Sequence, residues 1–220
     1  MIERLKLCVL ASGKGTDLQS VIDGCESKVI TSACIALVIS NVPGAYALER
    51  AMKHGIKAVC IPHKGLTRQR HEESIAKEIK AHGIGLVVLA GYIRVLTPRF
   101  FELCEVPVVN IHPCLLPLFG GKGWYGERVH QAVIASGARY SGCTVHVVTP
   151  DIDAGPIIVQ KVVQVYPSDT WESLAERVLA MEHRLLPFAI ELMASGRARL
   201  IDGRVCIDDY AGVEREIASW

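Results

Sequence analysis

Short apolar runs alternate with longer stretches of helical spacing through the first half of the chain. The apolar runs, rich in Val, Ile, Leu and Cys, are Leu5–Ala11, Ala33–Ser40, Lys57–Ile61, Gly85–Ala90 and Val106–Asn110. The stretches with helical spacing are Asp17–Glu26, Ala45–His54 and Thr67–His82. Uninterrupted apolar strands that alternate with amphipathic helices are typical of a parallel sheet covered by helices on both faces. We therefore predict an α/β fold with a doubly wound, mostly parallel sheet.

The second half of the chain has a different pattern. Its predicted elements are two strands around an Asp-rich turn, a long helix and a small final hairpin, at Tyr140–Val148, Pro156–Val165, Trp171–Ser195, Ala198–Ile201 and Arg204–Ile207. Two strands separated only by a turn favour an antiparallel hairpin over another crossover. Because proline removes a helical hydrogen bond, we expect Pro187 to kink or interrupt the long helix. Residues 1–220 are predicted to form one domain with a Rossmann-like half at 1–110 and a second half at 111–220.

Composition narrows the class of protein. The chain has 220 residues, of which 50 % are hydrophobic, and this is enough for one large core. Its 24 basic and 23 acidic residues are nearly balanced and scattered, so we expect a small-molecule partner and no nucleic acid. The longest apolar runs, such as Leu86–Ala90, fall far short of the roughly 20 residues that a membrane span needs. We therefore expect no membrane partner.

The N-terminus and the cysteines favour a cytoplasmic protein. Met1–Leu10 contains charged residues and no small-residue cleavage signal, so no export signal is visible. The eight cysteines form no C-x-x-C pair, and several lie within apolar strand-like runs. In a chain of this size without a signal peptide, we expect reduced, buried cysteines. No spacing of cysteine or histidine suggests a metal.

Candidate chemistry lies at the end of the fifth apolar run, in Asn110–Pro113. Proline disfavours a helical conformation for the residue before it, so His112 should be extended, and residues i and i+2 of an extended segment point the same way. Asn110 and His112 therefore share a face, and Asp153 follows in the Asp-rich turn. An amide donor, an imidazole and a carboxylate suit a reaction in which a carbonyl oxygen becomes negative and a proton is moved. The set predicts acyl-type transfer.

A glycine-containing loop, Ser12–Asp17, follows the first strand and opens the first helix. Backbone N–H groups and the helix dipole favour an anion at such a place. A dinucleotide site is not expected, because Leu18 replaces the third glycine of G-x-G-x-x-G and the second strand ends in Ser40 and Asn41, without a carboxylate for ribose. The spacing is not that of a P-loop either. The loop is predicted to bind a single phosphate, with a tight turn that binds no ligand as the alternative.

Four motifs resemble those of the phosphoribosylglycinamide formyltransferase family. They are Ser12-Gly13-x-Gly15-Thr16-x-Leu18, Leu89 to Leu96, Asn110-Ile111-His112-Pro113-x-Leu115-Leu116-Pro117 and Asp153-x-Gly155-Pro156. The similarity runs from Leu5 to about Pro187, and Asp202–Val205 resembles the family's tail. Any one motif would be weak, but four in the family's order and spacing are specific. The resemblance implies the formyltransferase fold.

The resemblance also implies an activity. The formyl group of 10-formyltetrahydrofolate, the co-substrate, would pass to the amine of N1-(5-phosphoribosyl)glycinamide in de novo purine (IMP) synthesis. Asn110 would donate a hydrogen bond to the oxyanion, and His112, as an imidazolium, would supply a proton to the leaving nitrogen. Asp153 would favour protonated His112, orient its ring and relay the proton lost by the amine through water. The enzyme would need no metal, and it is expected to be a monomer or a homodimer.

Binding residues follow from the same family match. The positions that match ribonucleotide contacts are Gly15, Thr16, Asp17 and Glu182. The positions that match folate contacts are Arg68, Ile93, Arg94, Val95, Leu96 and Asn110. The match assigns phosphate binding to 1–110, and folate binding and catalysis to 111–220. Asp17 and Cys114 depart from the family's commoner asparagine and serine.

Several of these residues also have a purely structural interpretation. Taken alone, Asn110 and His112 fit a strand-end turn with a hydrogen-bonded core histidine. Asp153 fits an ordinary turn residue, because Asp is common in turns. Arg68 fits a solvated helix start and Glu182 a surface residue.

Related functions make different demands on the sequence. A methionyl-tRNA formyltransferase is expected to carry a further basic domain, whereas this chain has a net charge of +1. A formyltetrahydrofolate hydrolase would share the Asn-His-Asp set but would not need the phosphate loop. A non-catalytic folate-binding module would not need all three catalytic residues. We favour formyl transfer to the ribonucleotide, with the hydrolase and the module as alternatives.

Overall fold

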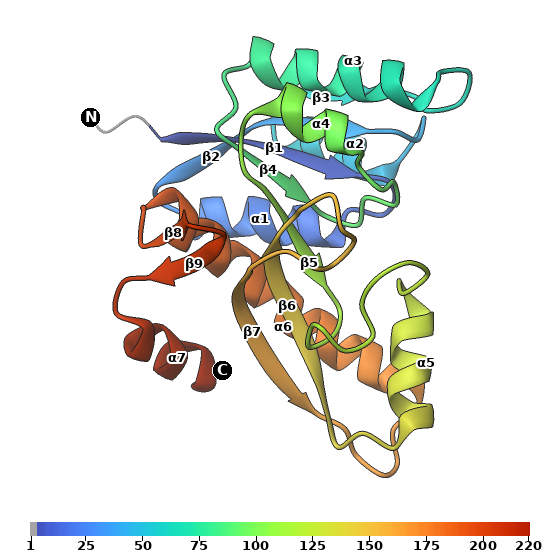
Figure 1. Cartoon of the computed structure of the whole chain (residues 1–220), viewed down its shortest axis with the longest axis vertical. Coiled ribbons are helices and arrows are strands. Elements are labelled where there is room, and N and C mark those ends of the chain that lie inside the picture. The colour runs from blue at the N-terminus through green and yellow to red at the C-terminus, as the bar shows by residue number, and fades with distance from the viewer. Residues whose placement is uncertain (1–3) are drawn as a thin grey trace. The chain divides into compact units, whose positions relative to one another are not determined.

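A computed structural model describes residues 4–220 (Figure 1). Residues 1–3, which belong to the segment considered above for an export signal, lie outside the described residues. The chain divides into two compact units, one that ends at Asn110 and one that begins at Ile111. We call them the first and the second unit and describe each by itself.

The first unit alternates strands and helices. Its elements in chain order are β1 (Leu5–Ala11), α1 (Thr16–Glu26), β2 (Ala33–Ser40), α2 (Tyr46–Lys53), β3 (Ala58–Cys60), α3 (Arg68–Ala81), β4 (Leu86–Leu89), α4 (Pro98–Cys104) and β5 (Val108–His112), the last of which crosses into the second unit. β1 pairs in parallel with both β2 and β4, β2 with β3, and β4 with β5. Figure 1 shows α3 and α4 on one side of these strands and α1 on the other. The predicted doubly wound parallel sheet is confirmed.

β1 is the strand at which the chain order reverses. The chain adds β2 and β3 on one side of β1, and then returns to add β4 on the other side. In open α/β sheets, ligands bind outside the carboxyl ends of the strands at such a switch point. The loops that leave β1 and β4 are the glycine loop and Ala90–Thr97. Two of the predicted binding segments therefore begin at the switch point.

β5 runs two residues further than its apolar run predicts. The predicted strand ends at Asn110, whereas β5 ends at His112, directly before Pro113. Asn110 and His112 are thus two positions apart on one strand, as the extended geometry of the residue before proline predicts. In a strand, positions i and i+2 face the same side.

The second unit begins with β5's last two residues and contains a hairpin, a long helix and a small terminal hairpin. Its elements are α5 (Glu127–Ser136), β6 (Tyr140–Val147), β7 (Ile157–Gln164), α6 (Trp171–Ala194), β8 (Ala198–Ile201), β9 (Arg204–Ile207) and α7 (Tyr210–Ala218). β6 and β7 are antiparallel, as are β8 and β9. The hydrogen-bonded strand order is β3-β2-β1-β4-β5-β6-β7, with β8 and β9 in a separate sheet. The predicted hairpins and their turns are confirmed.

α6 corrects half of the expectation about Pro187, the interruption. The helix runs from Trp171 to Ala194 without a break, and Pro187 lies inside it; a kink there stays a prediction. The side chains from Leu185 to Ile190 are all buried, so packing on both sides of the proline outweighs the one backbone hydrogen bond that it removes. The N-terminus is held by a capping box in which Thr170 and Ser173 bond each other's backbone N–H groups.

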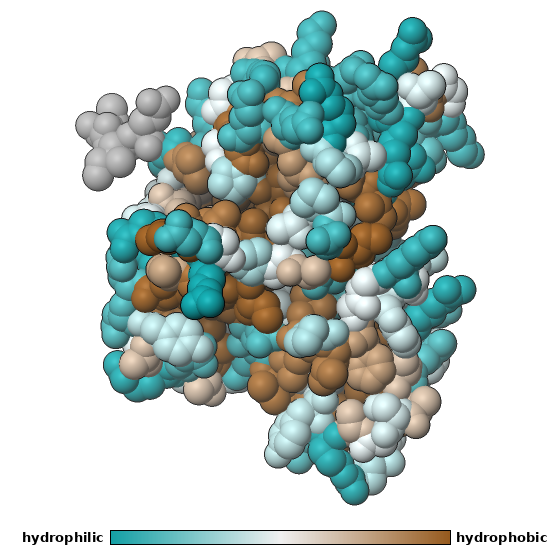
Figure 2. Space-filling view, in the orientation of Figure 1, coloured by the Kyte–Doolittle hydropathy of each residue, from teal (hydrophilic) through white to brown (hydrophobic). Residues whose placement is uncertain are grey.

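Three helices are absent from the sequence prediction. α4 has only 7 residues and begins with Pro98, α5 follows Gly126, and α7 begins after Asp209, whose side chain accepts from the Gly212 N–H. Proline at the first helical position and Asp as an N-cap are recognisable start signals. No helix among residues 4–220 is long and apolar enough to cross a membrane. Polar and charged side chains cover much of α3 on the face shown in Figure 2.

The glycine loop depends on the conformation of Gly15. This residue precedes α1 with a φ of 69°, and a Cβ added to it would lie 2.8 Å from the Cβ of Ala47. Left-handed backbone costs a side-chain-bearing residue of order 1–3 kcal/mol, and the contact with α2 adds to this. Gly13, in the same loop, has open space around its Cα.

We expect Gly15→Ala to lower the free energy of unfolding by at least about 1–3 kcal/mol, because both the strain and the overlap with Ala47 act on it. Gly13→Ala is the matched control and should stay within about 0.5 kcal/mol of the wild type. Urea denaturation of both variants measures the difference. Equal stabilities would show that the loop does not need the left-handed conformation at residue 15.

Candidate active site

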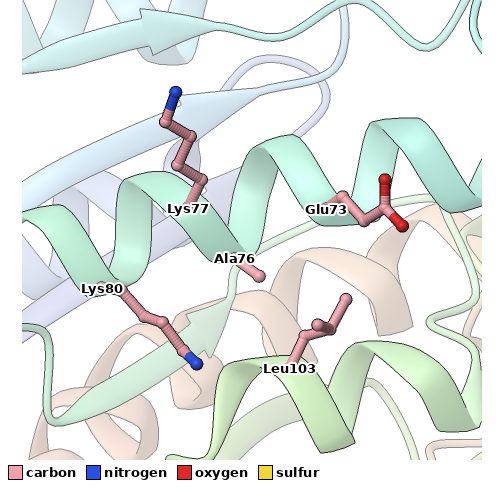
Figure 3. A pocket seen from close by; sticks show the side chains of 5 residues that line it. All are labelled: Glu73, Ala76, Lys77, Lys80 and Leu103. Atoms are coloured by element: carbon pink, nitrogen blue, oxygen red, sulfur yellow. The ribbon is translucent and has the colours of Figure 1, made fainter.

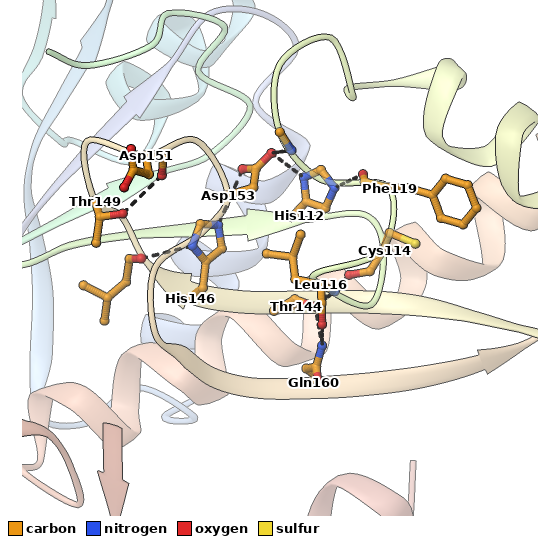
Figure 4. A network of polar contacts seen from close by, with 12 residues as sticks. His112, Cys114, Leu116, Phe119, Thr144, His146, Thr149, Asp151, Asp153 and Gln160 are labelled. Carbon is orange, nitrogen blue, oxygen red and sulfur yellow. Dashed lines mark hydrogen bonds and ion pairs between the residues drawn. The ribbon is translucent and has the colours of Figure 1, made fainter. Parts of the chain in front are cut away.

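Asp153 faces two histidine rings in the second unit (Figure 4). It lies in the turn between β6 and β7, and its Oδ2 is 3.7 Å from Nδ1 of His112. Its Oδ1 is 3.8 Å from Nε2 of His146. These are ion-pair distances, longer than hydrogen bonds. The backbone N–H of Gly121 donates to Oδ2 at 2.9 Å and fixes the carboxylate between the rings.

His112 has a polar neighbour at each ring nitrogen. The residue is 4 % exposed, and Nε2 of its ring donates to the carbonyl oxygen of Phe119 at 2.8 Å. A carbonyl oxygen can only accept, so Nε2 carries a hydrogen in this arrangement. Nδ1 then faces the Asp153 carboxylate. The backbone of one loop and the side chain of another therefore set the orientation of the ring.

His146 and His130 form the buried surroundings of this pair. Burial lowers the pKa of His146; its own contact with the Val147 carbonyl oxygen at 3.0 Å and the charge of Asp153 oppose that shift. Burial also lowers the pKa of His130, and the nearby His112 lowers it further. Nδ1 of His130 is buried and has no hydrogen-bond partner among the described residues. Sequence reasoning missed His130, because a single histidine in α5 carries no spacing signal.

The chain after His112 is anchored to the hairpin through Thr144 (Figure 4). The Thr144 hydroxyl donates to the carbonyl oxygen of Cys114 at 2.7 Å and accepts from the N–H of Leu116 at 3.0 Å. Gln160 donates to both the Thr144 hydroxyl and the Leu116 carbonyl oxygen. Burial raises the pKa of the Cys114 thiol, so this cysteine is a neutral packing residue at ordinary pH.

In the first unit, α2 holds the glycine loop in place. The N–H of Ala47 donates to the carbonyl oxygen of Gly13 at 3.1 Å, and Nε of Arg50 donates to the carbonyl oxygen of Lys14 at 2.9 Å. Thr16 and Asp17 are the first two residues of α1. The loop carbonyls are thus directed toward α2. The N–H groups that open α1 are the groups that an anion would use.

The predicted folate segment, Ile93 to Leu96, is held by two side chains of α3. Nη2 of Arg68 donates to the carbonyl oxygen of Val95 at 2.6 Å. The carboxylate of Glu72, which is only 2 % exposed, accepts from the N–H of Thr97 at 3.0 Å and also from its hydroxyl. Arg68 is therefore not only a solvated helix start. Glu72 was not predicted, because a glutamate within a helical run carries no signal of burial.

The remaining predicted residues lie as follows. Ile93 and Val95 are exposed and Leu96 is buried. Arg94 is half-buried in the same segment, and Asn110 is half-buried on β5. Glu182 lies on α6 in the second unit and is 7 % exposed, so the interpretation of Glu182 as a surface residue is wrong. Its helix face points to the interior because its neighbours along the helical period are apolar and buried.

A separate groove lies between α3 and α4 (Figure 3). It has a volume of about 300 Å³ and is lined by Glu73, Ala76, Lys77, Lys80 and Leu103. None of the predicted site residues lines it. Within residues 4–220 there is also no cluster of three or more His, Cys, Asp or Glu side chains suited to a metal ion.

The mostly parallel sheet with its antiparallel hairpin and long helix matches the fold of solved formyltransferase structures. A family model described as formyl transferase matches residues 5–190. Two solved structures share the fold: glycinamide ribonucleotide transformylase 1 from Symbiobacterium toebii (TM-score 0.87, 40 % identity, 94 % of this chain and 95 % of that one) and phosphoribosylglycinamide formyltransferase from Coxiella burnetii (TM-score 0.86, 37 % identity, 94 % of each chain).

Curated relatives narrow the family. The phosphoribosylglycinamide formyltransferase of Haemophilus influenzae is 36 % identical over 207 residues, which cover 94 % of this chain and 95 % of that protein. The trifunctional purine biosynthetic protein adenosine-3 of Gallus gallus is 38 % identical over 205 residues, or 92 % of this chain. The chain spans only 14 to 20 % of the first trifunctional relatives. It belongs to the formyl transferase family and, within it, to the phosphoribosylglycinamide formyltransferases.

The lowered pKa of His130 predicts how stability depends on pH. As pH falls below about 6.5, the unfolded chain binds a proton at this residue before the folded protein does, so the free energy of unfolding declines. One such group contributes a slope of at most about 1.4 kcal/mol per pH unit. We expect His130→Gln to flatten the decline between pH 7 and 5.5 in urea denaturation. A slope as steep as that of the wild type would contradict burial of a neutral imidazole.

Proposed function

We propose that this protein transfers the formyl group of 10-formyltetrahydrofolate to the amine of N1-(5-phosphoribosyl)glycinamide. The products are the N-formyl ribonucleotide and tetrahydrofolate, in de novo purine synthesis. The observation that carries the proposal is the Asp153 carboxylate facing His112 in a chain of this family. The names of the relatives support the ribonucleotide as the acceptor of the formyl group. We also propose that the enzyme is cytoplasmic and that it acts as a monomer or a homodimer.

The proposed reaction begins when the amine nitrogen attacks the formyl carbon. A C–N bond forms, and the formyl oxygen takes the electron pair as an oxyanion. The side-chain N–H of Asn110 donates to that oxygen, which is the kind of fixed donor that stabilises developing charge. Collapse of the intermediate returns the electron pair and breaks the bond to the folate nitrogen.

Protons are moved by His112 and Asp153. In the proposed step His112 is the proton donor: its Nε2 carries a hydrogen, and its Nδ1 faces the Asp153 carboxylate. His112 gives a proton to the leaving folate nitrogen. The proton that the amine loses passes through water to Asp153, and then restores His112. Every proton released by the amine is thus accounted for within the cycle.

The substrates are assigned to different segments. Gly15, Thr16, Asp17 and Glu182 would hold the ribonucleotide, with the phosphate on the N–H groups that open α1. Arg68, Ile93, Arg94, Val95, Leu96 and Asn110 would hold the folate. The bond from Arg68 to Val95 supports a fixed backbone for the pterin. Because Asp17 is negatively charged, the phosphate would be bound by backbone N–H groups rather than by that side chain.

A formyl-transfer assay tests the proposal. Tetrahydrofolate release is followed with the ribonucleotide present and then omitted. We expect release only when the ribonucleotide is present, together with stoichiometric N-formyl product. Release without the ribonucleotide would show a formyltetrahydrofolate hydrolase, and no release in either case would show a non-catalytic binding module.

Asn110→Ala should lower turnover by about a hundredfold to a thousandfold, because the oxyanion loses its side-chain donor. Steady-state kinetics with both substrates varied separates turnover from affinity. Binding of the ribonucleotide, measured by calorimetry, should stay near the wild-type value. A loss confined to substrate affinity would exclude the oxyanion role.

Asp153→Asn should shift the pH dependence of transfer. Without the carboxylate the relay loses the group that takes up the proton of the amine and passes it to His112, so transfer should be slower and its pH profile should change shape. Asparagine tolerates the left-handed φ of 54° at this position, so the backbone should be kept. Asp151→Asn is the matched control, because Asp151 lies in the same turn and its side chain is exposed. Superimposable pH profiles for the two variants would contradict the coupling of Asp153 to His112.

A further inference from the structure

Ser12 joins the end of β1 to the segment that follows β4. Its backbone N–H donates to the carbonyl oxygen of Gly91 at 3.1 Å, and its hydroxyl accepts from the N–H of Ile93 at 3.0 Å. The residue is 8 % exposed. One buried side chain and its own peptide group thus fix the first part of Gly91–Thr97.

Asn41 determines how the Ser12 hydroxyl is oriented. Asn41 follows β2 and is fully buried, and the Ser12 hydroxyl donates to its Oδ1 at 2.6 Å. A hydroxyl has one hydrogen, so once it is given to Asn41 a lone pair is left for the Ile93 N–H. The amide and the backbone N–H therefore hold the hydroxyl in one rotamer.

Asn41 is itself held by the loop after β3. Nδ1 of His63 lies 3.2 Å from Nδ2 of Asn41 and 3.0 Å from the Asn41 carbonyl oxygen; it accepts from the first or donates to the second, according to its tautomer. The contacts run from the loop after β3 to those after β2, β1 and β4, which are neighbours in the sheet. Buried polar groups that have partners in this way fix a loop strongly, because losing one partner leaves the other unsatisfied.

We propose that Ser12 and Asn41 are positioning residues for the folate. They need not touch it; they set the backbone of Ile93–Leu96 from its N-terminal side, as Arg68 and Glu72 set it from the other side. The proposal rests on the proposed function, which assigns that segment to the folate. Ser12 is also the first residue of the glycine loop, but its side chain bonds toward Ile93 and Asn41 and not toward Gly13–Asp17.

Ser12→Ala tests the proposal. We expect KM for 10-formyltetrahydrofolate to rise about fivefold to tenfold, as the loss of one buried hydrogen bond implies, with kcat at saturation and KM for the ribonucleotide close to wild type. Hydrogen exchange at the Ile93 amide should become faster in the free protein. Ser20→Ala is the matched control, because that hydroxyl is also buried and donates to a backbone carbonyl of α1, at 2.8 Å. It should change neither the folate KM nor the Ile93 exchange.

The outcomes distinguish failure of the positioning role from failure of the proposed function. An unchanged folate KM in Ser12→Ala overturns the positioning role, whether or not exchange at Ile93 is faster. An equal rise of KM for both substrates overturns it as well, since that would be general damage to the first unit. If the wild type does not use 10-formyltetrahydrofolate, the proposed function fails instead. Thermal melts check folding, and exchange at Ile93 gives a result that does not depend on activity.

Discussion

Buried polar side chains must find hydrogen-bond partners inside the protein, and this requirement fixes the loops of both units. In the first unit Ser12 and Glu72 accept from backbone N–H groups of the segment after β4, and Asn41 accepts from the Ser12 hydroxyl. In the second, Thr144 satisfies the chain after His112, and Asp153 accepts from Gly121. Burial of apolar side chains stabilises the sheet, whereas these few hydrogen bonds fix the backbone conformation of its loops.

Much of the fold could be predicted because burial leaves a short-range pattern in the sequence. β1, β2, β8 and β9 have the predicted bounds, since each apolar or alternating run ends where the chain turns. The three helices that were missed have 7 to 10 residues, and only α7 has a side-chain cap, from Asp209, so their start signals in the sequence are weak. The expected interruption at Pro187 is wrong because a local rule says nothing about how firmly α6 is packed.

The candidate site also has a part that could be predicted from the sequence and a part that could not. Asn110 and His112 are close in the chain, so strand geometry alone puts them on one face. That Asp153 reaches His112 depends on how the β6–β7 turn folds back, with the residue in a left-handed conformation that the sequence does not reveal. Glu72 and His130 could not be predicted from the sequence for a similar reason. Their importance comes from burial and from distant neighbours, and neither leaves a periodic signal.

The close approach of Ala47 to Gly15 limits which residues the glycine loop can accept at position 15. A Cβ at Gly15 would overlap both the Cβ and the Cα of Ala47, so a side chain at position 15 requires α2 to move, and α2 also holds the carbonyls of Gly13 and Lys14. Over evolutionary time a side chain at position 15 should therefore be tolerated only where α2 has shifted away from the loop. Ala47 is in this way subject to the same selection as the loop that α2 supports.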